Sequence, residues 1–348
     1  MAVVDLDPGL TSAGPPAIAA ALAGHVGEPL LVRLDADALA AGPETDLRRW
    51  LRTVPFATLC VGDPPRVVRE SVDAWVPDPV AADRLAAGFE RAPHAALAAA
   101  LLVREPPVGV WAGLVAESTT YSMLQGGPEF AAWRAGRAES RLTDDDSEDE
   151  SDAGPRVRVS ERHGHTVVTL TRGHKHNALD ARLRDELDAA LAPLVDGRGP
   201  VIVRGEGPSF CSGGDLDEFG SFPDPVAAHV VRLTRSLAGR FHALERRLVV
   251  GLHGSCLGAG IELPAFAGKV IAADDARIGL PELGLGLVPG AGGTVSIPRR
   301  AGRNTLLQLL WDGGVVDARR ARRVGLVDEV VPPTRLAERC HEVADSLG

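Results

Sequence analysis

The sequence predicts an α/β protein with a smaller N-terminal domain and a larger C-terminal one. The chain of 348 residues is long enough for two hydrophobic cores. Short apolar runs typical of strands alternate with helical segments in both parts. Between them lies the acidic segment TDDDSEDESDAGP, which cannot bury a core. We therefore expect an α/β accessory domain over residues 1–140, an acidic linker over residues 141–155 and the larger domain over residues 156–348.

The N-terminal part contains apolar runs at residues 30–34 and 56–61 that we interpret as strands. Residues 81–103 read as helix with a break at Pro93, and residues 108–111 as a further strand. This order resembles the C-terminal pattern and suggests a degenerate copy of it. One polar patch, formed by Glu117, Ser118 and Tyr121, is interpreted as part of a helix that packs onto the second domain, with a role in lining the active site or an interface as the alternative.

The C-terminal part opens with two alternating runs around His163-Gly164, which predict a β-hairpin. Asp180 can cap a helix whose apolar face carries leucines three or four residues apart. The elements that we expect to follow are a strand at 201–203, a helix at 233–244, a strand at 248–252 and a helix start at Ile261. This alternation predicts a largely parallel sheet.

Charge and composition exclude several classes of protein. The formal net charge is −10, and seven acidic residues lie within residues 144–152, so no basic face for nucleic acid is present. The longest apolar run, residues 95–103, is too short to span a membrane. The N-terminus lacks the pattern of a signal peptide, and the four cysteines show no disulfide or metal spacing. We expect a cytoplasmic protein with reduced thiols and no metal.

Two glycine-rich turns carry the first chemical signal. They are PSFCSGGDL at residues 208–216 and GSCLGAGIEL at residues 254–263, each following a predicted strand. Glycines let a backbone approach a ligand closely, and two free amides aimed at one point make an oxyanion hole. Each turn alone is also compatible with tight packing.

Two glutamates in apolar surroundings carry the second signal. Glu262 lies in GIELP and Glu282 in GLPELG. Apolar surroundings disfavour a charged carboxylate and can adjust it for proton transfer near neutral pH. A capping or salt-bridge role is the alternative for either residue alone.

Taken together, these motifs resemble the enoyl-CoA hydratase/isomerase family, the crotonases. The resemblance rests on KHNALD (175–180), both glycine-rich turns, AADDARIGLPE (272–282), GLPELGLGLVPGAGGT (279–294), IPRRAGR (297–303) and ARRVGLVDEVVP (321–332). It covers nearly all of residues 156–340 in order and at normal spacing. It implies the crotonase (ClpP-like) fold, a superhelix of ββα units.

The resemblance also implies roles for single residues. The amides of Gly214 and Ala259 match the oxyanion hole, and Glu262 and Glu282 match the two catalytic glutamates of the hydratases. The family's coenzyme A site matches Lys175, His176, Ala178, Ser212 and Leu216. The implied reaction is addition of water to a 2-enoyl-CoA without a metal or redox cofactor, in a homo-oligomer (trimer or hexamer) that a partner subunit could join.

Two departures from the family pattern keep alternatives open. The N-terminal part has no counterpart in ordinary crotonases, and only about sixteen residues follow Pro332, where relatives continue with helices that cover the coenzyme. We expect the N-terminal domain or a partner to replace this cover. The alternatives to a hydratase are another crotonase reaction, such as isomerisation or hydrolysis, and a non-catalytic subunit that binds acyl-CoA.

Overall fold

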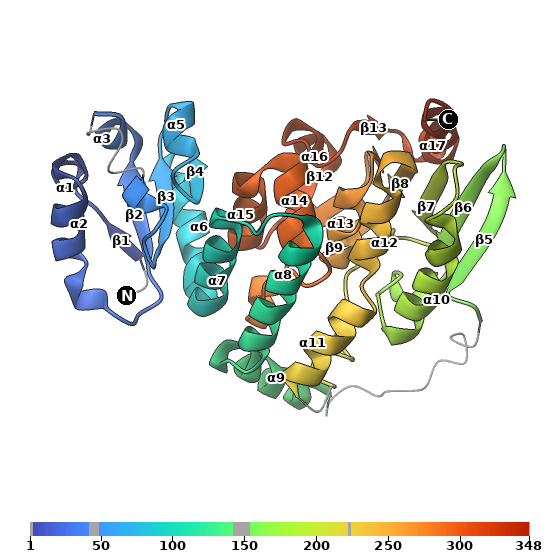
Figure 1. Cartoon of the computed structure of the whole chain (residues 1–348), viewed down its shortest axis with the longest axis horizontal. Coiled ribbons are helices and arrows are strands. Elements are labelled where there is room, and N and C mark those ends of the chain that lie inside the picture. The colour runs from blue at the N-terminus through green and yellow to red at the C-terminus, as the bar shows by residue number, and fades with distance from the viewer. Residues whose placement is uncertain (1–2, 42–48, 142–153, 222–223, 348) are drawn as a thin grey trace.

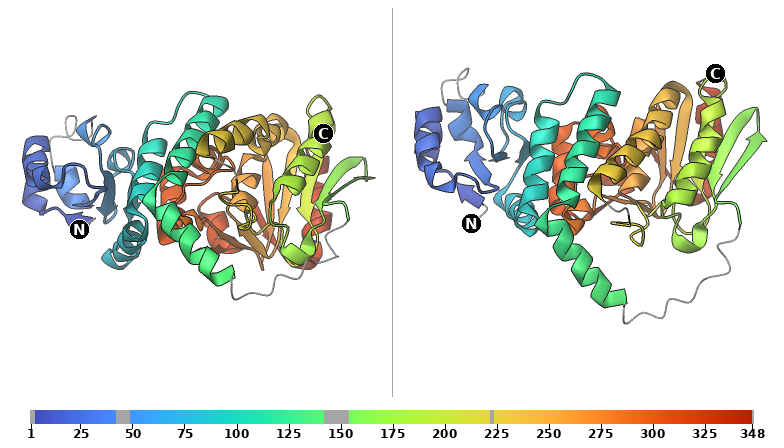
Figure 2. Two further views of the ribbon diagram at one scale, coloured as in Figure 1. Left: turned by 90° about the horizontal axis from the view of Figure 1, so that it is seen from below. Right: turned by 60° about the horizontal axis from the view of Figure 1, so that its bottom comes forward.

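The computed structural model describes residues 3–41, 49–141, 154–221 and 224–347. A small N-terminal sheet, a central layer of helices and a larger C-terminal part follow one another along the longest axis (Figures 1 and 2). The predicted acidic linker lies almost entirely outside the described residues. Within them, no helix combines the length and the apolar character needed to cross a bilayer.

The N-terminal sheet consists of four parallel strands in the order β1-β2-β3-β4. The predicted strands at 30–34 and 56–61 are confirmed as β2 and β3, and their residues are mostly buried because both faces of the sheet are covered. One face packs on α1, α2, α3 and α5, the other on the central helices. The bounds are β1 Val3–Asp5, β2 Leu31–Asp35, β3 Ala57–Val61, β4 Ala74–Val76, α1 Pro8–Ala13, α2 Pro15–Ala21, η1 Ala23–His25, α3 Ala36–Ala41 and α5 Arg66–Arg69.

Four central helices follow: α6 Pro79–Arg91, α7 Pro93–Arg104, α8 Val110–Gln125 and α9 Pro128–Arg141. The predicted break at Pro93 is confirmed, since proline occupies the first turn of α7. The predicted strand at residues 108–111 is wrong. Val110 instead begins α8, whose sequence is apolar on nearly every side, and such a run does not distinguish a strand from a buried helix.

The central helices join the two halves into one body. α6 and α7 lie between the small sheet and helices α14 and α15 of the C-terminal part, within one continuous hydrophobic core (Figure 1). α6 approaches so closely that a Cβ on Gly88 would lie 1.4 Å from the Trp311 carbonyl oxygen. The Trp311 ring packs edge-on against Phe89 and donates a hydrogen bond to the Ala96 carbonyl.

The outer edge of β4 is also covered from the C-terminal half. The Trp75 amide donates to Asn304 Oδ1 at 2.8 Å, and Gln308 Nε2 donates to the Trp75 carbonyl at 2.8 Å. Exposed strand edges carry unpaired backbone groups. Here two side chains of α15 pair with those of Trp75.

The C-terminal part contains a six-stranded sheet, in the order β13-β10-β8-β7-β6-β5, and a three-stranded sheet, β12-β11-β9. The hairpin β5–β6 is antiparallel and the remaining pairs of the large sheet are parallel. The strands are β5 Val157–Arg162, β6 His165–Leu170, β7 Val201–Gly205, β8 Leu248–Leu252, β9 Ser255–Leu257, β10 Lys269–Ala273, β11 Arg277–Gly279, β12 Val315–Asp317 and β13 Glu329–Val331.

A repeating unit links the two sheets. β8 and β10 lie in the large sheet, the next strands β9 and β11 lie in the small one, and a helical segment follows each pair. The helices and 3₁₀ turns are η3 Gly173–Lys175, α10 Ala181–Leu191, η4 Ala192–Leu194, α11 Pro225–Thr234, α12 Leu237–Leu244, η5 Glu245–Arg247, α13 Ala259–Glu262, η6 Pro264–Phe266, η7 Glu282–Leu285, α14 Gly293–Ala301, α15 Arg303–Asp312, α16 Ala318–Arg323, η8 Pro333–Arg335 and α17 Leu336–Asp345. This is the ββα superhelix that the resemblance implies.

Two details test the predicted helices. Asp180 accepts a hydrogen bond from the Leu183 amide and caps α10, as expected. The single helix predicted over residues 233–244 is wrong in its extent. Ser236 is extended and divides α11 from α12, while Asp224 caps α11 ten residues earlier than Thr234.

Candidate active site

The two glycine-rich turns lie side by side. The Cys211 amide donates to the Ser255 carbonyl, and the Leu257 amide donates to the Cys211 carbonyl, so Cys211 and Cys256 form a parallel bridge. Both cysteines are buried and free, and burial raises the pKa of Cys211 to about 11. A protonated thiol is a poor nucleophile. The two cysteines therefore act as small packing residues.

The two residues predicted to supply the oxyanion amides, Gly214 and Ala259, both line one cavity of ≈ 440 Å³. Leu179 bonds to the residues on either side of Gly214, through its amide to the Gly213 carbonyl and through its carbonyl to the Asp215 amide. This parallel pairing turns the Gly214 amide away from Leu179. Among the hydrogen bonds of the described residues, neither the Gly214 nor the Ala259 amide has a protein acceptor.

Both predicted glutamates line the same cavity and are nearly inaccessible, with 2% of Glu262 and 8% of Glu282 exposed. Glu262 Oε2 accepts hydrogen bonds from the Ala291 amide at 2.7 Å and the Gly293 amide at 2.9 Å. Glu282 Oε2 is buried and has no hydrogen-bond partner in the part of the chain that the structure describes. A buried, unpaired oxygen of this kind requires a functional explanation.

The two carboxylates converge beside Gly258, the residue before Ala259. A Cβ on Gly258 would lie 2.7 Å from Glu282 Oε1 and 3.8 Å from Glu262 Oε1. Its φ of 49° is also strained for other residues. Any larger residue at this position would therefore displace the Glu282 carboxylate.

Burial is the largest cause of the raised pKa values of both acids. It raises the pKa of Glu282 to about 8 and that of Glu262 well above its ordinary value. Repulsion from Glu282 and Glu117 raises the pKa of Glu262 further, while its two amide donors oppose the shift. Such donors favour an ionised carboxylate, and they contact Glu262 Oε2, whereas none contacts Glu282 Oε2 within the described residues.

The residues matched to the coenzyme A site divide into two sets. Ser212 and Leu216 line the cavity, whereas Lys175, His176 and Ala178 do not. The segment 175–178 nevertheless lies alongside, because the Ser212 amide donates to the His176 carbonyl at 3.0 Å. Buried Asn177 holds this segment by donating to the carbonyls of Glu206 and Ser209.

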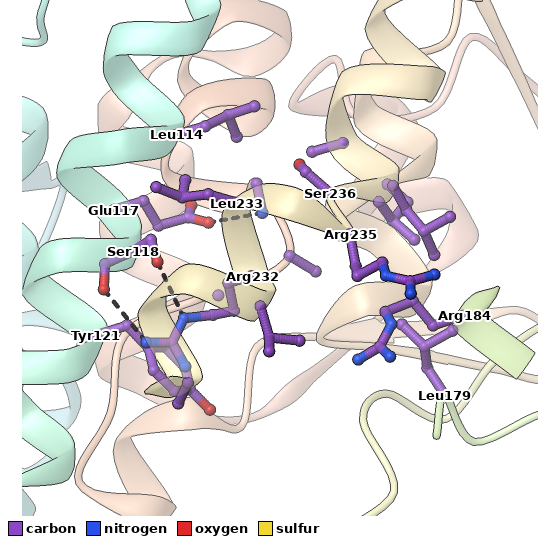
Figure 3. A pocket seen from close by; sticks show the side chains of 18 of the residues that line it. Leu114, Glu117, Ser118, Tyr121, Leu179, Arg184, Arg232, Leu233, Arg235 and Ser236 are labelled. Carbon is purple, nitrogen blue, oxygen red and sulfur yellow. Dashed lines mark hydrogen bonds between the residues drawn. The ribbon is translucent and has the colours of Figure 1, made fainter. Parts of the chain in front are cut away.

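A second cavity, of ≈ 210 Å³, adjoins the first between α8 and the helices α11 and α12 (Figure 3). Both cavities are lined by Tyr121, Leu179, Phe219, Arg232, Gly290 and Ala291. Glu117 and Ser118 of α8 line the second cavity. The interpretation of this patch as a helix packed on the C-terminal part is confirmed, and the residues line the site as well.

Sequence reasoning missed the importance of Glu117 and did not identify Trp133 of α9, which lines the first cavity. A signal for Glu117 was present, since it is the single charged residue between Val110 and Gln125. Trp133 carried no comparable signal. Arg299 and Arg300, in the last turn of α14, form ion pairs with Glu245 and Asp328.

Comparisons with known proteins place the C-terminal part. The sequence model of the enoyl-CoA hydratase/isomerase family matches residues 161–348. A crystal structure of enoyl-CoA hydratase from Thermoplasma volcanium is 30% identical with a TM-score of 0.51, covering 56% of this chain and 78% of that one. The enoyl-CoA hydratase of Bacillus anthracis is 30% identical (TM-score 0.50; 55% and 76% covered) and that of Mycobacterium smegmatis 26% identical (0.51; 56% and 77%).

The family match extends over more than half of the chain, and the three solved structures each cover 55–56% of it. The chain therefore belongs to the enoyl-CoA hydratase/isomerase family.

Proposed function

We propose that this family member is an enoyl-CoA hydratase, which adds water across the C2=C3 double bond of a 2-enoyl-CoA thioester. The observation that carries the proposal is the convergence of Glu262 and Glu282 on one cavity beside two unpaired amides. Hydration needs a base for the water and an acid for C2. The hydrogen bonds around the two carboxylates support an ionised Glu262 as the base and a protonated Glu282 as the acid.

The reaction would proceed with the thioester oxygen between the amides of Gly214 and Ala259, which stabilise negative charge on that oxygen. Removing one such donor typically costs about 3 kcal/mol of transition-state stabilisation. Ionised Glu262 takes a proton from water as the water oxygen bonds to C3, and Glu282 gives its proton to C2. Transfer of the proton from Glu262 to Glu282 then restores the starting state.

The N-terminal half would supply the cover that the sequence leads us to expect. Tyr121 of α8 and Trp133 of α9 line the cavity that holds the two glutamates. The adjoining cavity between α8 and α11 is far too small for coenzyme A and suits a short acyl group. We therefore assign the first cavity to the thioester and the second to the acyl chain.

The test is hydration of crotonyl-CoA by the full chain, followed as loss of the enoyl absorbance. Glu262→Gln and Glu282→Gln should each lower kcat by roughly 10²- to 10⁴-fold. Glu186→Gln is the control, because Glu186 lies on α10 and binds the amides of Arg156 and Val157 instead. An undiminished rate in either active-site variant contradicts the assigned roles.

Product analysis separates the alternatives. A shifted double bond identifies an isomerase, and free coenzyme A identifies a hydrolase. Binding of crotonyl-CoA without turnover identifies a non-catalytic subunit.

A further inference from the structure

The loop at residues 290–294, which begins α14, is held by two carboxylates from opposite halves of the chain. Glu262 accepts from the amides of Ala291 and Gly293. Glu117 of α8 accepts from the amides of Gly292 and Thr294 at 2.7 and 2.9 Å, and from Thr294 Oγ1 at 2.7 Å. The first amides of a helix have no partner within the helix. Here they alternate between the two acids.

The use of their oxygens distinguishes the two acids. Both oxygens of Glu117 accept hydrogen bonds from the loop, from three donors in all. Glu262 uses Oε2 for the loop, while its Oε1 lies near Gly258 and the cavity. We propose that Glu117 is a positioning residue, which fixes the loop that in turn fixes the catalytic carboxylate of Glu262.

Glu117 also influences the charge of the site. The titratable or charged groups that face it are Tyr121 on its own helix, Arg232 of α11, Glu262 of α13 and Glu282 of η7. His229 of α11 bonds to the adjacent Ser118. Burial raises the pKa of Glu117 to about 7, although its three donors and Arg232 favour the charged form. When charged, Glu117 raises the pKa of Glu262 and Glu282 by repulsion.

Arg232 of α11 supports this arrangement by binding the same face of α8 that carries Glu117. Its guanidinium donates to Ser118 and Ser122 and to Gln125 Oε1, and lies 4.4 Å from the Tyr121 ring centroid. All these partners belong to α8. These contacts hold α8 against α11 and so fix the position of Glu117 relative to the loop at residues 290–294.

The test is Glu117→Gln, which keeps the shape but directs an NH₂ group at an amide donor of the loop. The inference rests on the proposed hydratase, so wild-type hydration of crotonyl-CoA is measured first. We expect kcat to fall roughly 10- to 100-fold, as for small displacements of a catalytic group, with KM changed less than about 3-fold. The limb of the pH–kcat profile that reports ionisation of Glu262 and Glu282 should move to lower pH, because the negative charge of Glu117 no longer raises their pKa values.

A merely structural role would lower the yield of folded protein without moving the pH profile. An unmoved profile, or a change confined to KM, overturns the proposal. Glu186→Gln is the matched control, since that carboxylate also binds two backbone amides but lies outside both cavities.

Amide exchange separates failure of the inference from failure of the proposed function. Peptides that contain residues 290–294 should exchange faster in Glu117→Gln than in Glu186→Gln. If the wild type does not hydrate crotonyl-CoA, the proposed function fails, and amide exchange alone then decides whether Glu117 fixes the loop. Equal exchange in the two variants overturns the inference whatever the reaction.

Discussion

Replacing Glu282 by glutamine should make the protein more stable at alkaline pH while removing its activity. The pKa of Glu282 rises from 4.5 to about 8 on burial. A carboxyl with a raised folded pKa binds its proton more tightly in the folded state. The contribution of Glu282 to the free energy of unfolding is therefore complete below pH 4.5, falls as the pH rises from 4.5 to 8, and is lost above pH 8.

The magnitude follows from the shift. At about 1.4 kcal/mol per pKa unit, ionising Glu282 costs the folded state on the order of 5 kcal/mol in total, and about 3 kcal/mol of this is lost between pH 6 and pH 9. Glu282→Gln lacks this cost. For a chain of 348 residues, its Tm relative to wild type should therefore rise by about 4 °C more at pH 9 than at pH 6.

The assay is thermal unfolding of both proteins at pH 6 and pH 9, with exposed Glu90 of α6 as the control position for a Gln substitution. Glu90→Gln should show no pH-dependent difference from wild type. An equal Tm difference for Glu282→Gln at both pH values would refute the reasoning, because Glu282 would then not ionise in this range.

Three further predictions follow from packing and geometry. Gly258→Ala places a Cβ 2.7 Å from Glu282 Oε1 at a φ of 49°. We expect the free energy of unfolding to fall by about 1–3 kcal/mol, measured by denaturant unfolding. The rate of crotonyl-CoA hydration should fall roughly 10²-fold. Trp311→Ala removes a fully buried ring between α6, α7 and α15 and should cost about 3–5 kcal/mol, seen as a lower denaturant midpoint. The double change Asn304→Ala and Gln308→Ala leaves the backbone of Trp75 without its partners and should cost about 1–3 kcal/mol, with faster amide exchange in β4.

Outcomes that contradict these predictions are equally specific. Wild-type turnover in Gly258→Ala would show that the glutamates do not converge there. A Trp311→Ala variant as stable as wild type would mean that the central helices do not share the C-terminal core. Unchanged exchange in β4 would show that α15 does not protect its edge. Thr119→Ala, at an exposed position of α8, serves as the common control.

The sequence predicted the C-terminal fold because its elements depend on local patterns. The predicted glutamates and oxyanion residues line one cavity, and their catalytic roles stay predictions. A short stretch of sequence is enough to recognise a turn that requires glycine, such as the one at Gly258, or a helix cap such as Asp180. The pairing of Glu262 with Glu282 became evident from motifs in a fixed order. These features need no knowledge of distant contacts.

The N-terminal half was harder because its decisive contacts are distant in sequence. Glu117 meets Gly292 across 175 positions, and nothing near it indicates that partner. α8 packs against α7 and α9 of its own half and against α11, α12 and α14 of the C-terminal half. Because apolar residues are therefore needed on most of its sides, its sequence lacks the periodicity that indicates a helix. The domain boundary at residues 141–155 stays a prediction.

The side-chain cover on β4 also affects how the chain can be made. Trp75 bonds to Asn304, 229 positions later, so this cover does not exist when the first strands leave the ribosome. At roughly 5–20 residues per second, the nascent sheet waits about 10–50 s with an open edge. During that interval a second nascent chain could pair with it. Slower translation or a holding chaperone should therefore influence the yield of this protein more than the stability of the finished fold would suggest.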